Sequence, residues 1–222
     1  MAFTTGEVLS VNLATRPRPT AAKPNPTGIG KIPADGPVHV SAPGPKGVGG
    51  SGLQGDTIGD RQHHGGDDQA VYAYAREDLD WWQQRLGRAL GPGAFGENLT
   101  TRGLDLTGAL VGERWRVGEA LVLEAACPRI PCGVFAEAMD ESRWVKRFTQ
   151  HGASGAYLRV VEPGPVAAGD RVEVVHRPAH QVTLGLYFRA LTTEPQQLAA
   201  LLEAGDALPA ETRALIARRT AV

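Results

Sequence analysis

Glycine and proline interrupt most of this chain so often that long regular elements cannot form there. The 222 residues contain 28 glycines and 16 prolines. Residues 16–37 hold 6 of the prolines, and residues 44–66 are too rich in glycine for a helix. A helical bundle is therefore disfavoured, and we expect a fold of short strands joined by turns and loops.

Short apolar stretches lie between these interruptions, and their composition and alternation predict strands. The predicted strands are residues 6–13, 38–42, 70–74, 109–118, 120–127, 155–161 and 170–177. Helices are predicted at residues 76–90, where Leu79, Trp82 and Leu86 share one face, and at residues 134–148. Regular short strands with few helices indicate a mainly β fold with flanking helices. We predict a β-barrel rather than a sheet of parallel βαβ units.

The C-terminal part of the chain differs in composition. Residues 194–220 predict a helix, a Gly-Asp turn and a second helix that starts at Pro209, where proline is tolerated in the first turn. We therefore predict a β-barrel domain over residues 1–178 and a small helical extension over residues 179–222. The extension is expected to shape a substrate entrance or an interface, and not to hold a cofactor.

Charge and cysteine content exclude several classes of protein. Lys and Arg number 23 and Asp and Glu 24, and the net charge of −1 indicates neither a nucleic-acid-binding arm nor a membrane-binding patch. No apolar run approaches the ~18 residues of a membrane span, and the N-terminus lacks the pattern of a signal peptide. With 2 cysteines a disulfide scaffold is also excluded, so we expect a soluble cytoplasmic protein.

Two motifs suggest chemistry that their surroundings do not support. Gly47, Gly49 and Gly52 match the dinucleotide-binding fingerprint, but the glycine-rich residues that follow cannot form the helix that would bind the pyrophosphate. His63 and His64 are adjacent, so their side chains diverge on an extended backbone, and a metal site built on both is disfavoured.

Both cysteines lie in the segment CPRIPC, residues 127–132, and three roles compete for them. A disulfide is unpromising, because an odd spacing puts the two side chains on opposite faces of a strand. Burial as a small apolar side chain suits Cys127, which ends an apolar stretch. A reactive or metal-binding thiolate suits Cys132, because a following helix N-terminus and the charge of Arg129 both favour a thiolate. The residues alone leave burial and reactivity of Cys132 open.

Polar residues elsewhere fit an anion-binding pocket around this thiol. Basic side chains that can surround an anion are Lys46, Arg61, His64 and Arg129. The loop FGEN adds the carboxylate of Glu97 and the amide of Asn98, which can bind a polar ring. A soft thiolate beside such a pocket suits a metal carried on a phosphorylated organic ligand.

In the order of its motifs, this chain resembles a MOSC domain, the C-terminal domain of molybdenum cofactor sulfurases. The motifs are GLQGD (52–56), HHGGDDQAVYAY (63–74), FGENLTT (95–101), VGERWRVGEALVLE (111–124) and PRIPC (128–132). The resemblance covers nearly the whole chain and is strongest to the small stand-alone bacterial type with a C-terminal three-helix extension. HGG, FGEN and PR-x-P-C are jointly specific, although each alone is weak. A proline often follows HGG in that type, where this chain has Asp67 in a loop.

The resemblance implies a β-barrel flanked by helices that binds the molybdenum cofactor, a pyranopterin dithiolene with a terminal phosphate. The cysteine that corresponds to Cys132 is then the protein's ligand to molybdenum, and Cys132 and His64 are the expected catalytic residues. The expected cofactor-binding residues are Lys46, Arg61, His64, Glu97, Asn98, Arg129 and Cys132. For Lys46 and Arg61, a solvated surface charge is the alternative.

Related proteins reduce N-hydroxylated compounds to amines, so the resemblance implies hydroxylaminopurines and amidoximes as substrates. Electrons must come from a separate reductase, because the chain has no haem motif and too few cysteines for an iron–sulfur cluster. The alternative is a carrier that holds the cofactor, or a persulfide sulfur on Cys132, and passes it to a client protein without turnover. The sequence leaves the choice between a monomer and a homodimer open.

Overall fold

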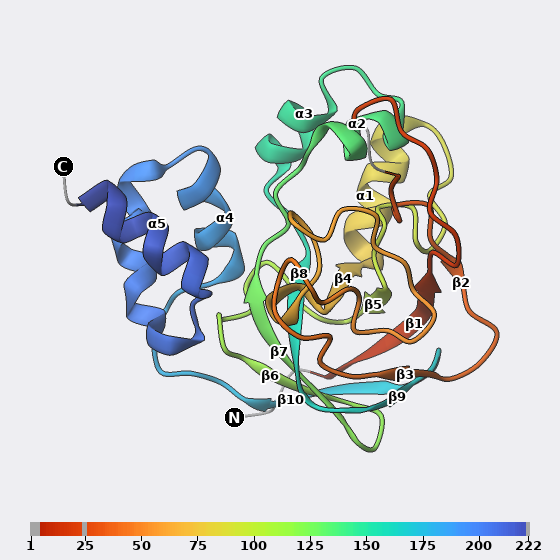
Figure 1. Cartoon of the computed structure of the whole chain (residues 1–222), viewed down its shortest axis with the longest axis horizontal. Coiled ribbons are helices and arrows are strands. Elements are labelled where there is room, and N and C mark those ends of the chain that lie inside the picture. Colours follow the sequence, from red (N-terminus) through yellow and green to blue (C-terminus); the bar gives the residue numbers. More distant parts are fainter. Residues whose placement is uncertain (1–4, 24–25, 221–222) are drawn as a thin grey trace.

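Strands close into a barrel in the computed structural model of this chain, which describes residues 5–23 and 26–220 (Figure 1). The 7 barrel strands follow the order β10-β6-β7-β8-β4-β5-β1, and β1 pairs again with β10. The strands are β1 Thr5–Leu13, β2 Ile32–Pro33, β3 Val38–Val40, β4 Val71–Ala75, β5 Leu99–Arg102, β6 Arg114–Val117, β7 Leu121–Cys127, β8 Ala156–Glu162, β9 Gly164–Val166 and β10 Arg171–His176. The short strand β2 pairs with β1, and β3 pairs with β9 outside the barrel. The predicted β-barrel is thus confirmed.

One pair of barrel strands is parallel. Strand β4 runs directly into helix α1, Arg76–Leu86, and the chain returns so that β5 lies parallel to β4. Helix α1 ends at Gly87, whose φ of 64° is sterically free for glycine. Strand β5 is absent from the strands predicted from the sequence, because LTTR is too short and too polar to stand out as a strand.

Strand β4 explains how the barrel is covered on its outer side. Val71, Ala73 and Ala75 point into the barrel core, while Tyr72 and Tyr74 point outward into a second, aromatic cluster. This alternation follows from the two-residue repeat of a strand, and both faces are buried because helices cover the outer one. The aromatic cluster draws on α1, on the FGEN loop and on the helices that follow Cys132.

The helix predicted over residues 134–148 is divided in two. Helix α2 spans Gly133–Met139 and helix α3 spans Trp144–His151. Between them Asp140 and Arg143 adopt positive φ angles of 50° and 56°, which end one helix and start the next in a new direction. The prediction of helical structure here is confirmed, but its continuity is wrong.

The chain after β10 is helical. It forms α4 (Leu184–Thr192), the 3-10 helical segment η2 (Pro195–Ala207) and α5 (Ala210–Thr220), which lie together beside the barrel (Figure 1). A turn at Gly205, with φ of 57°, interrupts η2 where the sequence has Gly-Asp. Leu184, Leu201 and Ile216 belong to the same apolar cluster as the barrel interior. The boundary between residues 178 and 179 stays a prediction. The barrel and the C-terminal helices share one apolar core, so packing does not mark a boundary between them.

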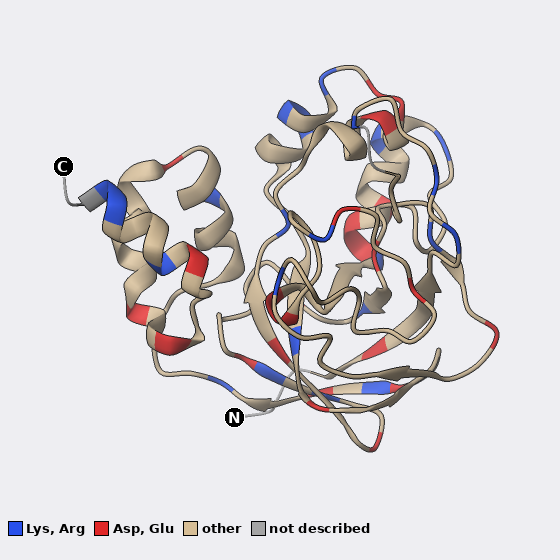
Figure 2. Cartoon of the chain, in the orientation of Figure 1, with Lys and Arg blue, Asp and Glu red and all other residues tan. Residues whose placement is uncertain are grey.

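Charges of both signs are interspersed along the barrel and the C-terminal helices (Figure 2). The chain has 23 basic and 24 acidic side chains, so the two signs of charge are also nearly equal in number. Within the part of the chain that the structure describes, no helix combines the length and the hydropathy that a membrane crossing requires.

Candidate functional site

The segment CPRIPC contributes to two different pockets. Arg129 and Cys132 line the first pocket, whereas Cys127, Pro128 and Ile130 line the second. The first pocket has a cavity volume of about 100 Å³, and residues of the loops that precede β2 and β4 make up much of its lining. Of the residues predicted to form the site, His64, Asn98, Arg129 and Cys132 meet in this first pocket.

The backbone of CPRIPC places the thiol of Cys132 at the pocket. Pro128 and Pro131 restrict φ on both sides of Arg129 and Ile130, so this segment is stiff. Cys132 itself is extended, with φ of −132° and ψ of 174°, and its carbonyl accepts the first hydrogen bond of α2 from Ala136 at 3.0 Å. The predicted position just before a helix is confirmed, although α2 has 7 residues and supplies only a short helix dipole.

Arg129 is a buried cation in the wall of the first pocket. It is 8% exposed, and its guanidinium carbon lies 3.7 Å from the ring centre of Phe135 and 5.2 Å from that of Tyr72. Its Nη1 donates a hydrogen bond of 2.5 Å to the carbonyl of Phe95. Among the described residues no carboxylate forms an ion pair with Arg129. Burial of a charge without a counter-charge is costly, so this position favours an anionic ligand.

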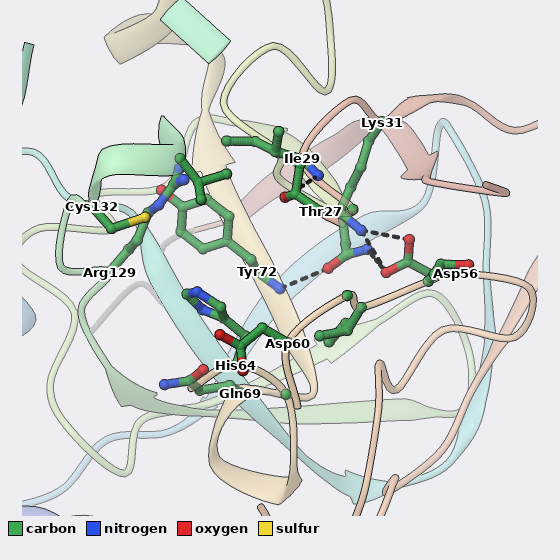
Figure 3. A pocket seen from close by; sticks show the side chains of 18 of the residues that line it. Thr27, Ile29, Lys31, Asp56, Asp60, His64, Gln69, Tyr72, Arg129 and Cys132 are labelled. Atoms are coloured by element: carbon green, nitrogen blue, oxygen red, sulfur yellow. Dashed lines mark hydrogen bonds and ion pairs between the residues drawn. The ribbon is translucent and has the colours of Figure 1, made fainter. Parts of the chain in front are cut away.

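A second charged group lies across the pocket from Arg129 (Figure 3). Lys31 Nζ lies 2.5 Å from Asp56 Oδ1, and the two side chains are 7% and 1% exposed. Burial lowers the pKa of Lys31, while the neighbouring Asp56 carboxylate acts in the opposite direction. Asn98 Nδ2 donates to Asp56 at 2.9 Å, and Asn98 Oδ1 accepts from the Tyr72 amide at 3.2 Å. Asn98 thus lines the pocket, but its side-chain nitrogen and oxygen both already form hydrogen bonds within the protein.

His64 lies on the Arg129 side of the pocket, and its ring points into the pocket (Figure 3). Burial lowers the pKa of His64 to about 4, and the charges of Arg129 and Lys23 add to this effect. The imidazole is therefore neutral at pH 7. His63, its neighbour in the sequence, turns away and places Nδ1 2.9 Å from Asp60. The expected divergence of the two side chains is confirmed, and no cluster of three metal-ligating side chains occurs in residues 5–23 and 26–220.

The neutral His64 predicts a pH-dependent stability. The unfolded chain takes up this proton near pH 6.5, but the folded protein takes it up only near pH 4. The contribution of neutral His64 to the free energy of unfolding is therefore complete above pH 6.5 and is lost as the pH falls from 6.5 to 4. We expect the wild type to lose up to about 3 kcal/mol relative to His64→Asn over this range. Urea unfolding of both proteins at pH 7 and pH 4 measures the difference.

The comparison with His64→Asn is needed because other buried groups titrate in the same range. Burial raises the pKa of Asp78 to about 6, so protonation of Asp78 stabilises the folded protein as the pH falls, opposite to the effect of His64. Burial also lowers the pKa of His151. Both groups are present in the wild type and in His64→Asn, so their effects cancel when the free energies of unfolding of the two proteins are subtracted. A difference that is constant between pH 7 and pH 4 would show that His64 is not held neutral.

The FGEN loop positions Arg129, and the buried carboxylate of Glu97 holds this loop in place. Glu97 is 0% exposed, and its carboxylate accepts hydrogen bonds from Gly93 N at 2.7 Å, Phe95 N at 3.0 Å and Thr100 Oγ1 at 2.9 Å. These bonds fix the Phe95 carbonyl that receives Arg129. The structure thus gives Glu97 a structural task, and a contact of Glu97 with the cofactor stays a prediction.

Two further predicted residues lie outside the first pocket. Lys46 lines the second pocket and forms an ion pair of 2.7 Å with Glu211 of α5. Arg61 is exposed on a loop and donates a hydrogen bond of 3.3 Å to the carbonyl of Val48. A role of these two side chains in binding a cofactor phosphate stays a prediction.

Steric constraints explain the two glycines of the HGG motif. Gly65 and Gly66 both have positive φ angles, 79° and 77°. A Cβ atom on Gly66 would lie 2.6 Å from the backbone of Lys46, and one on Gly65 would lie 2.6 Å from the carbonyl oxygen of Gly50. Glycine is therefore required at both positions so that the loop carrying His64 can pack against residues 44–50.

Sequence reasoning missed several residues of the first pocket. Lys23, Lys31, Asp56 and Tyr157 line it and lie in three separate segments of the chain. The loops that hold Lys31 and Asp56 have no periodicity, so no local pattern pairs two residues 25 positions apart. The alternation of AVYAY could have indicated that Tyr72 faces away from the barrel core, but not that it faces this pocket.

Comparison with known proteins shows which family and which structures this chain is similar to. The MOSC domain family matches residues 60–173. The Bacillus subtilis protein YflK is 36% identical over 172 residues, which make up 77% of this chain and 73% of YflK. The crystal structure of YiiM from Geobacillus stearothermophilus has a TM-score of 0.76 and 27% identity, covering 96% of this chain and 98% of YiiM. A protein of Gibberella moniliformis named reductase is 30% identical over 160 residues, which span 68% of this chain but 26% of that protein.

Proposed function

This chain belongs to the MOSC domain family. We propose that its first pocket binds a molybdenum cofactor, and that the protein uses this cofactor to reduce N-hydroxylated compounds to amines. The reaction consumes two electrons and two protons for each N–OH group, and it yields an amine and water. A separate reductase is the proposed source of the electrons, since the chain itself has 2 cysteines and no cluster of metal-ligating side chains among its described residues.

The observation that carries this proposal is the pairing of a thiol with a buried, uncompensated cation. Cys132 and Arg129 line one pocket, and Arg129 forms no ion pair with any carboxylate of the described chain. The other basic side chains of the pocket are compensated, Lys23 by Asp60 at 3.2 Å and Lys31 by Asp56. An anionic ligand that also offers a soft metal to the thiol satisfies both groups at once.

The donor set fits a molybdenum cofactor. Cys132 would hold the metal as a thiolate, and Arg129 would neutralise part of the negative charge of the dithiolene or phosphate. Neutral His64 would offer one ring nitrogen as a hydrogen-bond acceptor and the other as a donor. When bound, the cofactor supplies the two-electron chemistry that removes oxygen from nitrogen. Cys132 and Arg129 lie in the wall of a cavity of about 100 Å³, which would hold part of such a cofactor.

The reaction itself provides the test. Protein loaded with cofactor in a host that makes it should convert 6-hydroxylaminopurine to adenine when reduced methyl viologen supplies electrons. The Cys132→Ser protein serves as the blank, and we expect a rate at least about 100-fold lower for it, since it lacks the metal ligand.

Three results would replace this proposal. Equal rates for loaded wild type and blank across several N-hydroxylated substrates would exclude a reductase. Sulfur on Cys132 that dithiothreitol releases, together with an absence of turnover, would favour the carrier alternative. A molybdenum content near one per chain without turnover would indicate transfer of the cofactor to a client protein.

A further inference from the structure

A loop between β1 and β2 covers part of the first pocket. This loop, which we call the strap, comprises the described residues 15–23 and 26–30, and it extends from the end of β1 to α2 (Figure 1). The strap residues that line the first pocket are Lys23, Pro26, Thr27, Gly28 and Ile29. The strap is therefore one wall of the pocket that holds Arg129 and Cys132.

Both ends of the strap are attached to one buried carboxylate. Asp56 Oδ1 accepts a hydrogen bond of 2.8 Å from the amide of Ala14, which precedes the strap. The same oxygen lies 2.5 Å from Nζ of Lys31, which follows the strap. The side chains of Asp56 and Lys31 are 1% and 7% exposed. Water does not compete for these bonds, so the base of the strap is held firmly.

The strap between these ends has little buried surface. None of its described residues is buried, and most of them are exposed. Its outer part is attached to α2 through the carboxylate of Glu137. This carboxylate accepts hydrogen bonds from Thr20 Oγ1 at 2.5 Å, Ala21 N at 2.9 Å and Ala22 N at 2.8 Å, all of them exposed to water. A segment with few buried contacts and exposed hydrogen bonds opens more readily than a packed core.

Two glycines let the strap close tightly against the opposite rim of the pocket. A Cβ atom on Gly59 would lie 1.6 Å from the carbonyl oxygen of Pro26, and one on Gly28 would lie 2.0 Å from the carbonyl oxygen of Thr57. Both distances are far shorter than van der Waals contact, so a larger residue at either position would push the strap away from the rim. The closed position thus depends on a close approach of two backbones.

The closed pocket is too small for a whole pyranopterin cofactor. Its cavity volume is about 100 Å³, whereas sites that enclose small organic molecules measure on the order of 300–1,000 Å³. One wall must therefore move before such a ligand can reach Cys132. Other walls contain Tyr72, Asn98 and Arg129, which are 3%, 5% and 8% exposed. Movement of the strap disrupts less buried surface than movement of these residues would.

We propose that the strap is a lid that opens about its base at Asp56 to admit the molybdenum cofactor, and that Glu137 is the latch that closes this lid. This assignment rests on the proposed function, to which it adds the route by which the cofactor enters. Helix α2 follows Cys132 directly and carries Glu137 in its second turn. The helix that begins at the proposed metal ligand therefore also holds the lid shut.

The reactivity of the Cys132 thiol tests the lid without any cofactor. Cys127→Ser protein keeps Cys132 as its single cysteine, and the bulky reagent dithiobisnitrobenzoate reaches this thiol when the strap is open. We expect labelling to be about tenfold faster or more after addition of Glu137→Ala, since three hydrogen bonds to the strap are lost. The control is Glu77→Ala, which removes an exposed hydrogen bond to the amide of Gly103, outside the first pocket. It should leave the labelling rate unchanged.

A reversible lock tests the same motion from the closed side. A Cβ atom on Gly133 would lie 3.6 Å from that of Ala22, within the range of ~3.5–4.5 Å that a disulfide requires. The variant Ala22→Cys/Gly133→Cys is therefore oxidised in the Cys127→Ser background, and peptide mapping identifies the bond between the two introduced cysteines. The probe is molybdenum cofactor released from a purified molybdoenzyme, and uptake is measured as molybdenum per chain.

We expect the oxidised lock to take up at least about tenfold less molybdenum in the same time, and dithiothreitol to restore uptake. The control is Ala22→Ser/Gly133→Ser, treated with the same oxidant, which should behave as the wild type does. Equal labelling with and without Glu137→Ala, or undiminished uptake by the oxidised lock, would overturn the lid and leave the proposed function intact. A wild type that takes up no molybdenum would overturn the proposed function, and the labelling rates would still decide whether the strap opens over Cys132.

Discussion

Replacement of Cys132 by serine is expected to remove molybdenum from the protein and to abolish reduction of N-hydroxylated compounds. The thiol is the soft donor at the first pocket, and a serine hydroxyl is a poor ligand for a soft metal centre. We expect molybdenum content and activity to fall on the order of 100-fold. Metal analysis of protein from a host that makes the cofactor measures the first effect, and the viologen assay measures the second.

The matched control is Cys127→Ser, the same chemical change on the other side of the CPRIPC segment. Cys127 Sγ donates a weak hydrogen bond of 3.8 Å to the carbonyl of Asp68, which a serine hydroxyl can retain. Burial raises the pKa of the Cys127 thiol to about 12, so Cys127 stays protonated and cannot replace Cys132 as a metal ligand. We expect Cys127→Ser to lose about 1 kcal/mol of stability and to retain molybdenum. Equal molybdenum content in wild type and Cys132→Ser would remove the basis of the proposed site.

Replacement of Glu97 by alanine is expected to cause the largest loss of stability. Its carboxylate accepts three hydrogen bonds, from Gly93 N, Phe95 N and Thr100 Oγ1, at a position that water does not reach. Each buried donor left without a partner costs about 1–3 kcal/mol, so loss of the partner for all three donors should lower the free energy of unfolding by about 3–9 kcal/mol. Urea unfolding at pH 7 measures this loss. Molybdenum binding should also weaken, because the loop presents the carbonyl that holds Arg129.

The control for this variant is Glu77→Ala. Glu77 also accepts a hydrogen bond from a backbone amide, that of Gly103 at 2.8 Å, but it does so at the surface, where water can replace it. We expect a loss of about 1 kcal/mol or less for Glu77→Ala. Similar losses of stability for the two variants would show that the buried hydrogen bonds of Glu97 do not hold the FGEN loop in place.

The C-terminal helices are better tested by substitution than by truncation. Leu184, Tyr187 and Leu201 pack in the same apolar cluster as the barrel interior, so a chain that ends near residue 180 would expose part of that core. Such a truncation would lose stability for reasons unrelated to ligands. No described residue after Tyr157 lines the first pocket, and it stays a prediction that these helices do not hold the cofactor.

Several features of this protein followed from the sequence by itself. Dense glycine and proline excluded long helices, and short apolar stretches with a two-residue repeat indicated the strands of a barrel. The position of Cys132 just before a helix also followed from the sequence, which left the reactivity of this thiol open. These features depend on local backbone preferences, which neighbouring residues determine with little help from the rest of the chain.

The tertiary structure alone decided which side chains meet. It placed Arg129 in the first pocket without a carboxylate partner among the described residues, and it buried Glu97, which the sequence suggested as a ligand-binding residue. It also joined Lys31 to Asp56, and it turned Cys127 and Cys132 toward different pockets. These contacts depend on how irregular loops pack over the barrel. Such loops carry no repeat from which a partner many residues away could be read, so their pairing is fixed only when the whole chain folds.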